Sequence, residues 1–257
     1  MKKQNLEIFL TKSKSKFYIE NKERHTFNSL EPSIKYPLEK ADLRNCRILD
    51  VGCATGDMFN ALKERFSDIE YVGIDVDAKC INFAKTKYPE ATFKAIDLLS
   101  NTYEDESFDA VLMWSWFHMA PNWKDIIVEA CRLSRKHVLF DARLRLEGPT
   151  IIDIDCSYQF YHESGKRNHY ILHNLYELLS YFHIENLHIK KVIGYGYHYP
   201  GPTTAFIPLP VSEAYLGSFC IERYPFEERD FIRKGITLAD NLKKYVELDI
   251  NIPDYKI

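Results

Sequence analysis

The stretch ILDVGCATGDMF, from Ile48 to Phe59, decides the fold of this chain. Its apolar start predicts a buried strand, its glycines predict a tight turn, and the residues after Gly56 predict the start of a helix. Gly52 and Gly56 let the backbone turn sharply and approach a ligand without a side chain in the way. We expect the N–H groups at the helix start to form a polar cradle for that ligand.

A second strand follows at Tyr71–Asp75 and ends on a carboxylate about 20 residues after the glycines, the spacing expected of an acid that binds ribose hydroxyls. The dinucleotide fingerprint Gly-x-Gly-x-x-Gly would need glycines at Ala54 and Asp57, so that match is poor. An ordinary strand–turn–helix unit without a ligand is the structural alternative. The pattern therefore favours a nucleoside-binding turn of another kind.

The turn resembles the first motif of the class I S-adenosylmethionine-dependent methyltransferases, with an acid in the strand (Asp50) followed by Gly-x-x-Thr-Gly. It departs at Ala54, where the family often has glycine. The resemblance covers residues 45–140 well and 141–224 loosely. It implies S-adenosylmethionine as the cofactor and S-adenosylhomocysteine as its product. The residues that it assigns to the cofactor are Asp50, Gly52, Cys53, Ala54, Gly56, Asp75, Val76, Asp97, Leu98 and Trp114.

Three further acids extend this resemblance. Asp75 would accept hydrogen bonds from the ribose hydroxyls. Asp97 resembles the acid that takes the adenine amino group, and its alternative role is that of a helix cap or turn acid. Asp109 resembles the acid that opens the fourth strand, and we interpret it as structural.

The fourth and fifth strands suggest where the chemistry lies, because ligands bind at the carboxyl ends of strands in open α/β sheets. His118 follows the fourth strand, and a neutral imidazole can take a proton from a hydroxyl acceptor. Asp141 ends the fifth strand. The pair resembles the catalytic His and Asp of sugar-tailoring O-methyltransferases. The alternatives are a packing histidine, and an ion pair of Asp141 with Arg143 or Arg145.

The acceptor is expected to meet aromatic and basic side chains on the same face. The prolines after the sixth strand predict a restricted loop over 195–216, and arginines can hold a phosphate through forked hydrogen bonds. The predicted acceptor residues are Trp116, Arg143, Arg145, Tyr197, His198 and Tyr199.

Strand-like and helix-like segments alternate, which predicts an α/β fold: a doubly wound seven-stranded mixed sheet, the Rossmann-like methyltransferase fold, with only the last strand antiparallel. N-terminal helices and C-terminal insertions would form a lid, with a loop through Pro32 and Pro37. The expected strands are Arg47–Gly52, Tyr71–Asp75, Ala91–Ile96, Phe108–Trp114, His137–Asp141, Ile184–Gly194 and Gly217–Tyr224. The expected helices are Gly56–Phe66, Ala78–Tyr88, Trp123–Leu133, Ile171–Phe182 and one near Ile236–Val246.

Residues 1–257 are expected to form a single methyltransferase domain. Within it, 45–145 would be the cofactor-binding core, 146–224 the substrate-side insertions and last two strands, and 225–257 a C-terminal tail. The formal net charge of -3 offers no basic excess for nucleic acid, and no stretch reaches transmembrane length. Six scattered cysteines without Cys-x-x-Cys favour neither metal nor disulfides, so we expect a cytoplasmic protein.

The function that these patterns favour is S-adenosylmethionine-dependent methylation of a small-molecule acceptor. A saccharide hydroxyl, carried by a nucleotide-linked sugar for a surface glycan, is the first choice. Three alternatives stay open: an N-methyltransferase of a small amine, a non-catalytic S-adenosylmethionine-binding protein, and a nicotinamide-dependent reductase. A homodimer is an assembly that we keep open, and neither nucleic acid nor membrane is an expected partner.

Overall fold

The computed structural model describes Ile19 and residues 26–161, 165–184, 187–199, 201–202, 205–206, 213–225 and 246–251. Its strands are β1 Arg47–Val51, β2 Glu70–Asp75, β3 Thr92–Ala95, β4 Phe108–Met113, β5 Ser134–Arg145, β6 Tyr158–Tyr161, β7 Lys166–His169, β8 His173–Asn174, β9 Ile189–His198, β10 Ala205–Phe206, β11 Tyr215–Arg223 and β12 Val246–Asn251. Its α-helices are α2 Pro32–Lys40, α3 Asp57–Arg65, α4 Ala78–Lys87, α5 Trp123–Leu133 and α6 Leu175–Ile184. Short 3₁₀ turns are η2 Phe27–Ser29, η3 Leu98–Ser100 and η4 Phe117–Met119.

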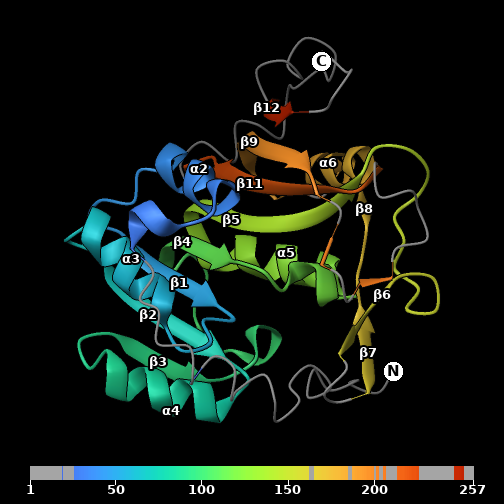
Figure 1. The fold of residues 1–257 in the computed structure, drawn as a ribbon. Coiled ribbons are helices and arrows are strands. Elements are labelled where there is room, and N and C mark those ends of the chain that lie inside the picture. The colour runs from blue at the N-terminus through green and yellow to red at the C-terminus, as the bar shows by residue number, and fades with distance from the viewer. Residues whose placement is uncertain are drawn as a thin grey trace.

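The main sheet has nine strands (Figure 1) in the order β12-β9-β11-β5-β4-β1-β2-β3, with β8 paired to β5 off this path. β11 runs antiparallel to both β5 and β9, while β12 pairs with β9 in parallel. The predicted doubly wound α/β fold with a mixed sheet is confirmed. The sheet is wider than the seven predicted strands because β8 and β12 join it. A second, three-stranded sheet is formed by β6 and β7, which follow β5, and by β10, which follows β9 and pairs with β6.

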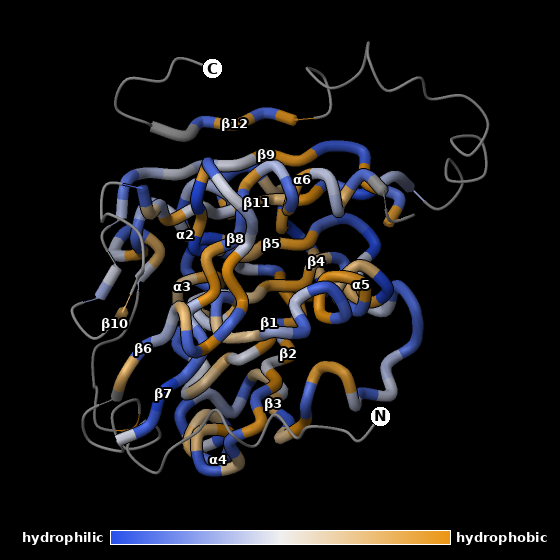
Figure 2. The backbone as a smooth tube through the Cα atoms, turned by 90° about the vertical axis from the view of Figure 1, so that its right-hand side faces the viewer, coloured by the Kyte–Doolittle hydropathy of each residue, from blue (hydrophilic) through white to orange (hydrophobic). Residues whose placement is uncertain are grey.

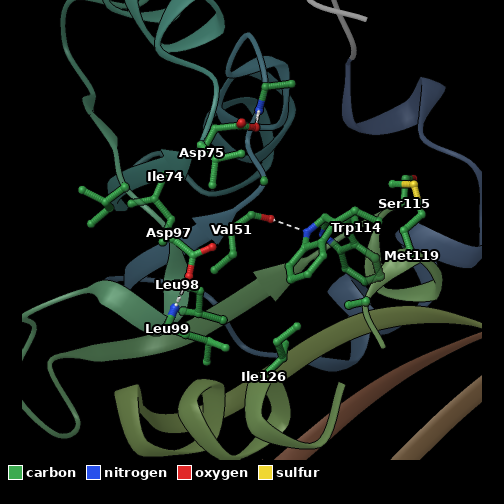
Figure 3. Close-up of a pocket in the computed structure, with 16 residues that line it drawn as sticks. Val51, Ile74, Asp75, Asp97, Leu98, Leu99, Trp114, Ser115, Met119 and Ile126 are labelled. Carbon is green, nitrogen blue, oxygen red and sulfur yellow. Dashed lines mark hydrogen bonds between the residues drawn. The ribbon is translucent and has the colours of Figure 1, made fainter. Parts of the chain in front are cut away.

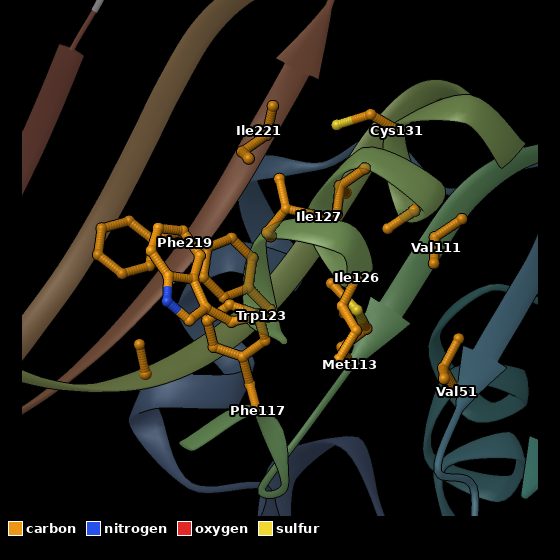
Figure 4. Packing of buried hydrophobic residues seen from close by; sticks show 14 of the residues in the cluster. Val51, Val111, Met113, Phe117, Trp123, Ile126, Ile127, Cys131, Phe219 and Ile221 are labelled. Carbon is orange, nitrogen blue, oxygen red and sulfur yellow. The ribbon is translucent and has the colours of Figure 1, made fainter. Parts of the chain in front are cut away.

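Helices cover both faces of the main sheet, and the central strands alternate between two cores. In β4, Val111 and Met113 belong to the core that includes residues of α5 and α6, and Figure 4 shows them beside α5. Ala110 and Leu112 belong to the core that includes residues of α2, α3 and α4. Burial on both faces explains the nearly continuous apolar run of the central strands, which is orange in Figure 2.

The prediction of a loop through Pro32 and Pro37 is wrong, since this stretch forms helix α2. Pro32 stands at the first helical position, where its missing N–H is not needed. Pro37 lies inside the helix and is buried together with Leu38. Packing of α2 on β9 and β11 therefore outweighs the local preference of proline against a helix.

Several other boundaries differ from the prediction, among them that of β5, which runs to Arg145 and not to Asp141, so that Asp141 lies inside the strand. Helix α6 begins at Leu175 and not at Ile171, because His173–Asn174 pair with β5. Strand β9 begins at Ile189 and runs on to His198, four residues into the predicted loop. The predicted helix near Ile236–Val246 lies outside the described residues except for Val246, which begins β12. Of the predicted lid, the residues before Thr26 other than Ile19 and parts of the C-terminal insertions lie outside them as well, and a lid stays a prediction. No helix in the described parts has the length and apolar composition to cross a bilayer.

Candidate active site

A pocket opens at the carboxyl ends of β1, β2 and β4, where the prediction places the cofactor. Figure 3 shows Asp75 and Asp97 on one side of it and Trp114, Ser115 and Met119 on the other. Its wall is formed by Val51, Gly52, Ala54, Ile74, Asp75, Val76, Ile96, Asp97, Leu98, Leu99, Trp114, Ser115, Trp116, Met119, Ala120 and Ile126. Apolar side chains dominate this wall, and the two carboxylates supply its charge.

The glycine turn forms the floor at β1. Gly52 has φ +73°, and a Cβ atom placed on it would lie 2.6 Å from the indole of Trp116. The N–H groups of Gly52 and Cys53 both donate to the Ile74 carbonyl, and that of Gly56 donates to the Cys53 carbonyl. The N–H groups of Gly52, Cys53 and Gly56 are therefore occupied by the protein's own acceptors, while the cradle expected at the start of α3 stays a prediction. The missing Cβ of Gly52 lets the indole of Trp116 approach the backbone of the turn closely.

Asp75 ends β2 and holds the turn in shape. Its Oδ2 accepts the N–H of Ala54 and its Oδ1 accepts that of Asp77, both at 2.9 Å. Burial raises the pKa of Asp75, and the two N–H donors oppose that rise. A carboxylate has about four acceptor positions, so each oxygen keeps one for a ligand hydroxyl. Ala54 has φ +46°, a left-handed conformation in which the methyl group is strained.

Asp97 has the cap role that the sequence left open, and its second oxygen is available for the other role, which stays a prediction. Its Oδ1 caps η3 by accepting the N–H of Leu99 at 2.7 Å. Its Oδ2 is buried and has no hydrogen-bond partner among the described residues. A buried carboxylate oxygen without a donor is costly unless a ligand supplies one. An amino group on a planar base fits this position, so the pocket fits the adenosine part of S-adenosylmethionine.

Three residues assigned to the cofactor lie behind the turn and do not line the pocket: Asp50, Cys53 and Gly56. Asp50 is almost fully buried and accepts a hydrogen bond from the hydroxyl of Tyr71. Burial raises the pKa of Asp50 to about 7, and the bond from Tyr71 opposes this rise. Gly56 caps α3 in the left-handed conformation. These residues shape the turn from its far side.

The predicted pair of His118 and Asp141 is not joined in the structure. Both oxygens of Asp141 have other donors, the N–H of Ser115 and Nη1 of Arg143, the latter at 2.6 Å. His118 is buried in η4 with its ring edge-on to Tyr170 at 5.2 Å, and it does not line the pocket. Asp141 instead forms the ion pair with Arg143 that the sequence left open as an alternative.

Of the predicted acceptor residues, Trp116 is in the pocket wall and the others are not. Trp116 lines the pocket, and its Nε1 donates to the Val51 carbonyl at 2.7 Å, the contact drawn in Figure 3. The guanidinium of Arg143 lies 5.3 Å from the ring centre of Tyr199.

Tyr197 stands in register with Leu216, which is in register with Arg143, so the three share one face of the sheet. His198 lies on the opposite face, beside Tyr215. Arg145 turns to the Pro149 carbonyl at 3.1 Å.

Sequence reasoning missed several wall residues and one neighbour of Arg143. Val51 and Ile74 stand at strand ends, and that position could have predicted them. Ile126 comes from the apolar face of α5, and its helical period indicates only burial. Tyr170 follows β7 in a segment without a recognisable motif. The other missed wall residues are Ile96, Leu99, Ser115, Met119 and Ala120.

Comparison with known proteins places the same segment in a family. Residues 48–137 match the family model described as a methyltransferase domain. The fatty-acid O-methyltransferase of Mycolicibacterium smegmatis is 30% identical over 115 residues, 43% of this chain and 42% of that protein. The carboxy-S-adenosyl-L-methionine synthase of Helicobacter pylori is 28% identical over 141 residues, 48% and 59% of the two chains. The structure of a SAM-dependent methyltransferase from Methanosarcina mazei aligns with a TM-score of 0.50 and 17% identity, covering 76% of this chain and 98% of that one.

Residues 48–137 thus match a methyltransferase domain, and the fold is one that is also found in S-adenosylmethionine-dependent methyltransferases. At 17% identity the similarity to the solved structure shows the fold alone. The chain spans about half the length of the curated relatives it matches, 42% of one and 59% of the other. The reaction that this protein catalyses is therefore a proposal that rests on the geometry of the site.

Proposed function

We propose that this protein transfers the methyl group of S-adenosylmethionine to an oxygen atom of a small-molecule acceptor. The observation that carries the proposal is the pair of carboxylates, Asp75 and Asp97, that face one pocket beside the tight turn at Gly52. The cofactor supplies an electrophilic methyl group on a sulfonium. The relative named as a fatty-acid O-methyltransferase supports oxygen as the methylated atom.

The residues of the pocket bind and orient the cofactor. Asp75 would accept the ribose hydroxyls, and Oδ2 of Asp97 would accept the adenine amino group. Gly52 leaves room for the indole of Trp116, and both residues line the pocket. Trp114 and Trp116 line the pocket and would exclude water from the reacting groups. Holding two reactants in line is the main catalytic contribution that such a site can make.

The acceptor remains a proposal. A saccharide hydroxyl is supported by the aromatic rings of Trp116 and Tyr199, which offer flat surfaces to a sugar. This acceptor needs a base, for which His118 is the candidate, although Asp141 does not orient it here. Because Arg145 turns away, the diphosphate of a nucleotide-linked sugar would rely on Arg143 alone. An amine acceptor, non-catalytic cofactor binding and a homodimer are further proposals from the sequence.

Calorimetry on the full-length protein tests this function. We expect S-adenosylhomocysteine to bind and NAD to bind far more weakly. Incubation with methyl-labelled S-adenosylmethionine and candidate acceptors then measures transfer. Preferred binding of NAD would contradict the cofactor assignment. Cofactor binding without transfer to any hydroxyl, carboxylate or amine would favour the non-catalytic alternative.

A further inference from the structure

The guanidinium of Arg143 is an unusual group at the carboxyl edge of the sheet. Its side chain is only 11% exposed, and its Nη1 is paired with Asp141. Its Nε is buried and has no hydrogen-bond partner among the described residues. A buried N–H of a charged group without an acceptor is costly, so such a group indicates a ligand acceptor.

This guanidinium is connected to the wall of the cofactor pocket through one side chain. Asp141 accepts from Arg143 with one oxygen and from the N–H of Ser115 with the other. Ser115 and its neighbour Trp116 both line the pocket. Arg143 therefore lies beside the part of the pocket wall that Ser115 forms.

Two aromatic side chains from separate segments surround Arg143. The ring of Tyr199 packs against the guanidinium at 5.3 Å. Tyr170 is almost fully buried between Arg143 and His118, and burial raises its pKa to about 12, an effect that the positive charge of Arg143 opposes. Tyr170 therefore keeps its proton near neutral pH and can donate a hydrogen bond beside the Arg143 Nε.

The charge of the cluster limits what it can accept. Asp141 already neutralises Arg143, and Arg145 is held at the Pro149 carbonyl. A phosphate dianion would bring two negative charges to a site without net positive charge. A carboxylate brings one, and the Arg143 Nε and the Tyr170 hydroxyl can each donate a hydrogen bond to it. A carboxylate is also ionised near neutral pH, so it needs no base, and the separation of His118 from Asp141 is then no obstacle.

We propose that Arg143 and Tyr170 bind the carboxylate of an acid acceptor, and that this carboxylate is the group methylated. The inference rests on the proposed methyltransferase function. A carboxylate oxygen forms a bond to the methyl carbon while the carbon–sulfur bond breaks, and the electron pair of that bond stays on sulfur. The products are a methyl ester and S-adenosylhomocysteine, and no proton is released.

Binding of simple acids to the protein saturated with S-adenosylhomocysteine tests the site. The probes are acetate, hexanoate and dodecanoate, with hexan-1-ol and methyl glucoside as neutral counterparts. We expect at least one acid to bind more tightly than its neutral counterpart. With methyl-labelled cofactor, the same acid should yield label that alkali releases as methanol, the property of a methyl ester.

Three variants locate the carboxylate. Arg143→Lys keeps a cation beside Asp141 but removes Nε, and Tyr170→Phe removes only the hydroxyl. Each should raise the Kd of the acid by about tenfold or more, the effect of losing a charge-assisted hydrogen bond, and leave S-adenosylhomocysteine affinity within about threefold. Arg135→Lys is the matched control, because Arg135 lies at the other end of β5 and pairs with Asp109. Thermal unfolding confirms that each variant is folded.

The outcomes separate the inference from the function on which it rests. Failure of the wild-type protein to bind S-adenosylhomocysteine would refute the proposed function itself. If the cofactor product binds but no acid does, or if Arg143→Lys and Tyr170→Phe bind the acid like the wild type, the carboxylate site is wrong. Label transfer to methyl glucoside and to no acid would also overturn it. An acid that binds without forming alkali-labile label would show that its carboxylate is not the methylated group.

Discussion

Substitution of Asp75 by asparagine removes one negative charge from the pocket and nearly preserves the shape of the side chain. The carboxylate faces two N–H donors, those of Ala54 and Asp77, at 2.9 Å each. An amide has one carbonyl oxygen, so the substituted side chain would turn its NH₂ group toward one of these donors. One backbone N–H is then left without an acceptor, which should lower the free energy of unfolding by about 1–3 kcal/mol.

The effect on the cofactor is separate. Hydrogen bonds from two ribose hydroxyls to a carboxylate are roughly twice as strong as those to a neutral amide. We expect Asp75→Asn to weaken binding of S-adenosylhomocysteine by about 2–3 kcal/mol, which is roughly a 30- to 150-fold rise in Kd. Calorimetry on the folded variant measures this change, and urea unfolding gives its stability.

Asp77→Asn is the matched control, since it makes the same substitution two residues away. Asp77 caps α4 by accepting the N–H of Lys79 at 2.8 Å, and it does not line the pocket. Asparagine caps helices as well as aspartate does, so stability and cofactor affinity should stay near the wild-type values. If Asp75→Asn binds S-adenosylhomocysteine within about threefold of the wild type, the ribose assignment is refuted.

Three further substitutions test stability by urea unfolding. Ala54→Gly should raise the free energy of unfolding by up to about 1 kcal/mol, because glycine adopts φ +46° without strain. Asp50 has a pKa raised to about 7 from an ordinary 3.8, so stability should fall as pH rises through this range, and Asp50→Asn should abolish that fall. His173 is fully buried, and neither ring nitrogen has a hydrogen-bond partner among the described residues; its pKa is lowered to about 3. His173→Phe should stabilise by about 1–3 kcal/mol and remove the loss of stability below about pH 6.5.

The position of the pocket could be predicted because its signals are local. Gly52 follows an apolar strand directly, and Asp75 ends the next strand, so short patterns place both at one edge of a parallel sheet. Asp97 could be located in the same way. One oxygen of Asp97 caps η3, and the other is buried without a hydrogen-bond partner among the described residues. This arrangement depends on the packing around η3, which no short sequence pattern indicates.

The parts that could not be predicted depend on tertiary contacts. Proline at 32 and 37 predicts a loop, yet burial of Leu38 against the sheet makes α2 a helix. The segment from Tyr195 to His198 precedes prolines, which predicts a loop. It pairs with β11 instead, and strand alternation then sends Tyr197 and His198 to opposite faces. Because the sequence predicts that the strand ends at Gly194, it assigns both Tyr197 and His198 to the acceptor surface, although they lie on opposite faces of the sheet.

Asp141 shows why a role inferred from strand position needs the structure. A carboxylate in the carboxyl-terminal half of β5 could reach a histidine, an arginine or a backbone N–H, and the sequence does not choose among them. The structure gives it Arg143 and the N–H of Ser115. Ser115 has φ +64°, a left-handed conformation that costs about 1–2 kcal/mol in a residue with a side chain.

A charged acceptor on the Ser115 N–H stabilises that conformation and so fixes the turn that carries Trp114 and Trp116 into the pocket. Asp141 thus acts as a positioning residue. It accepts the Ser115 N–H with one oxygen and Nη1 of Arg143 with the other, so a cation at position 143 is enough to keep the first bond in place.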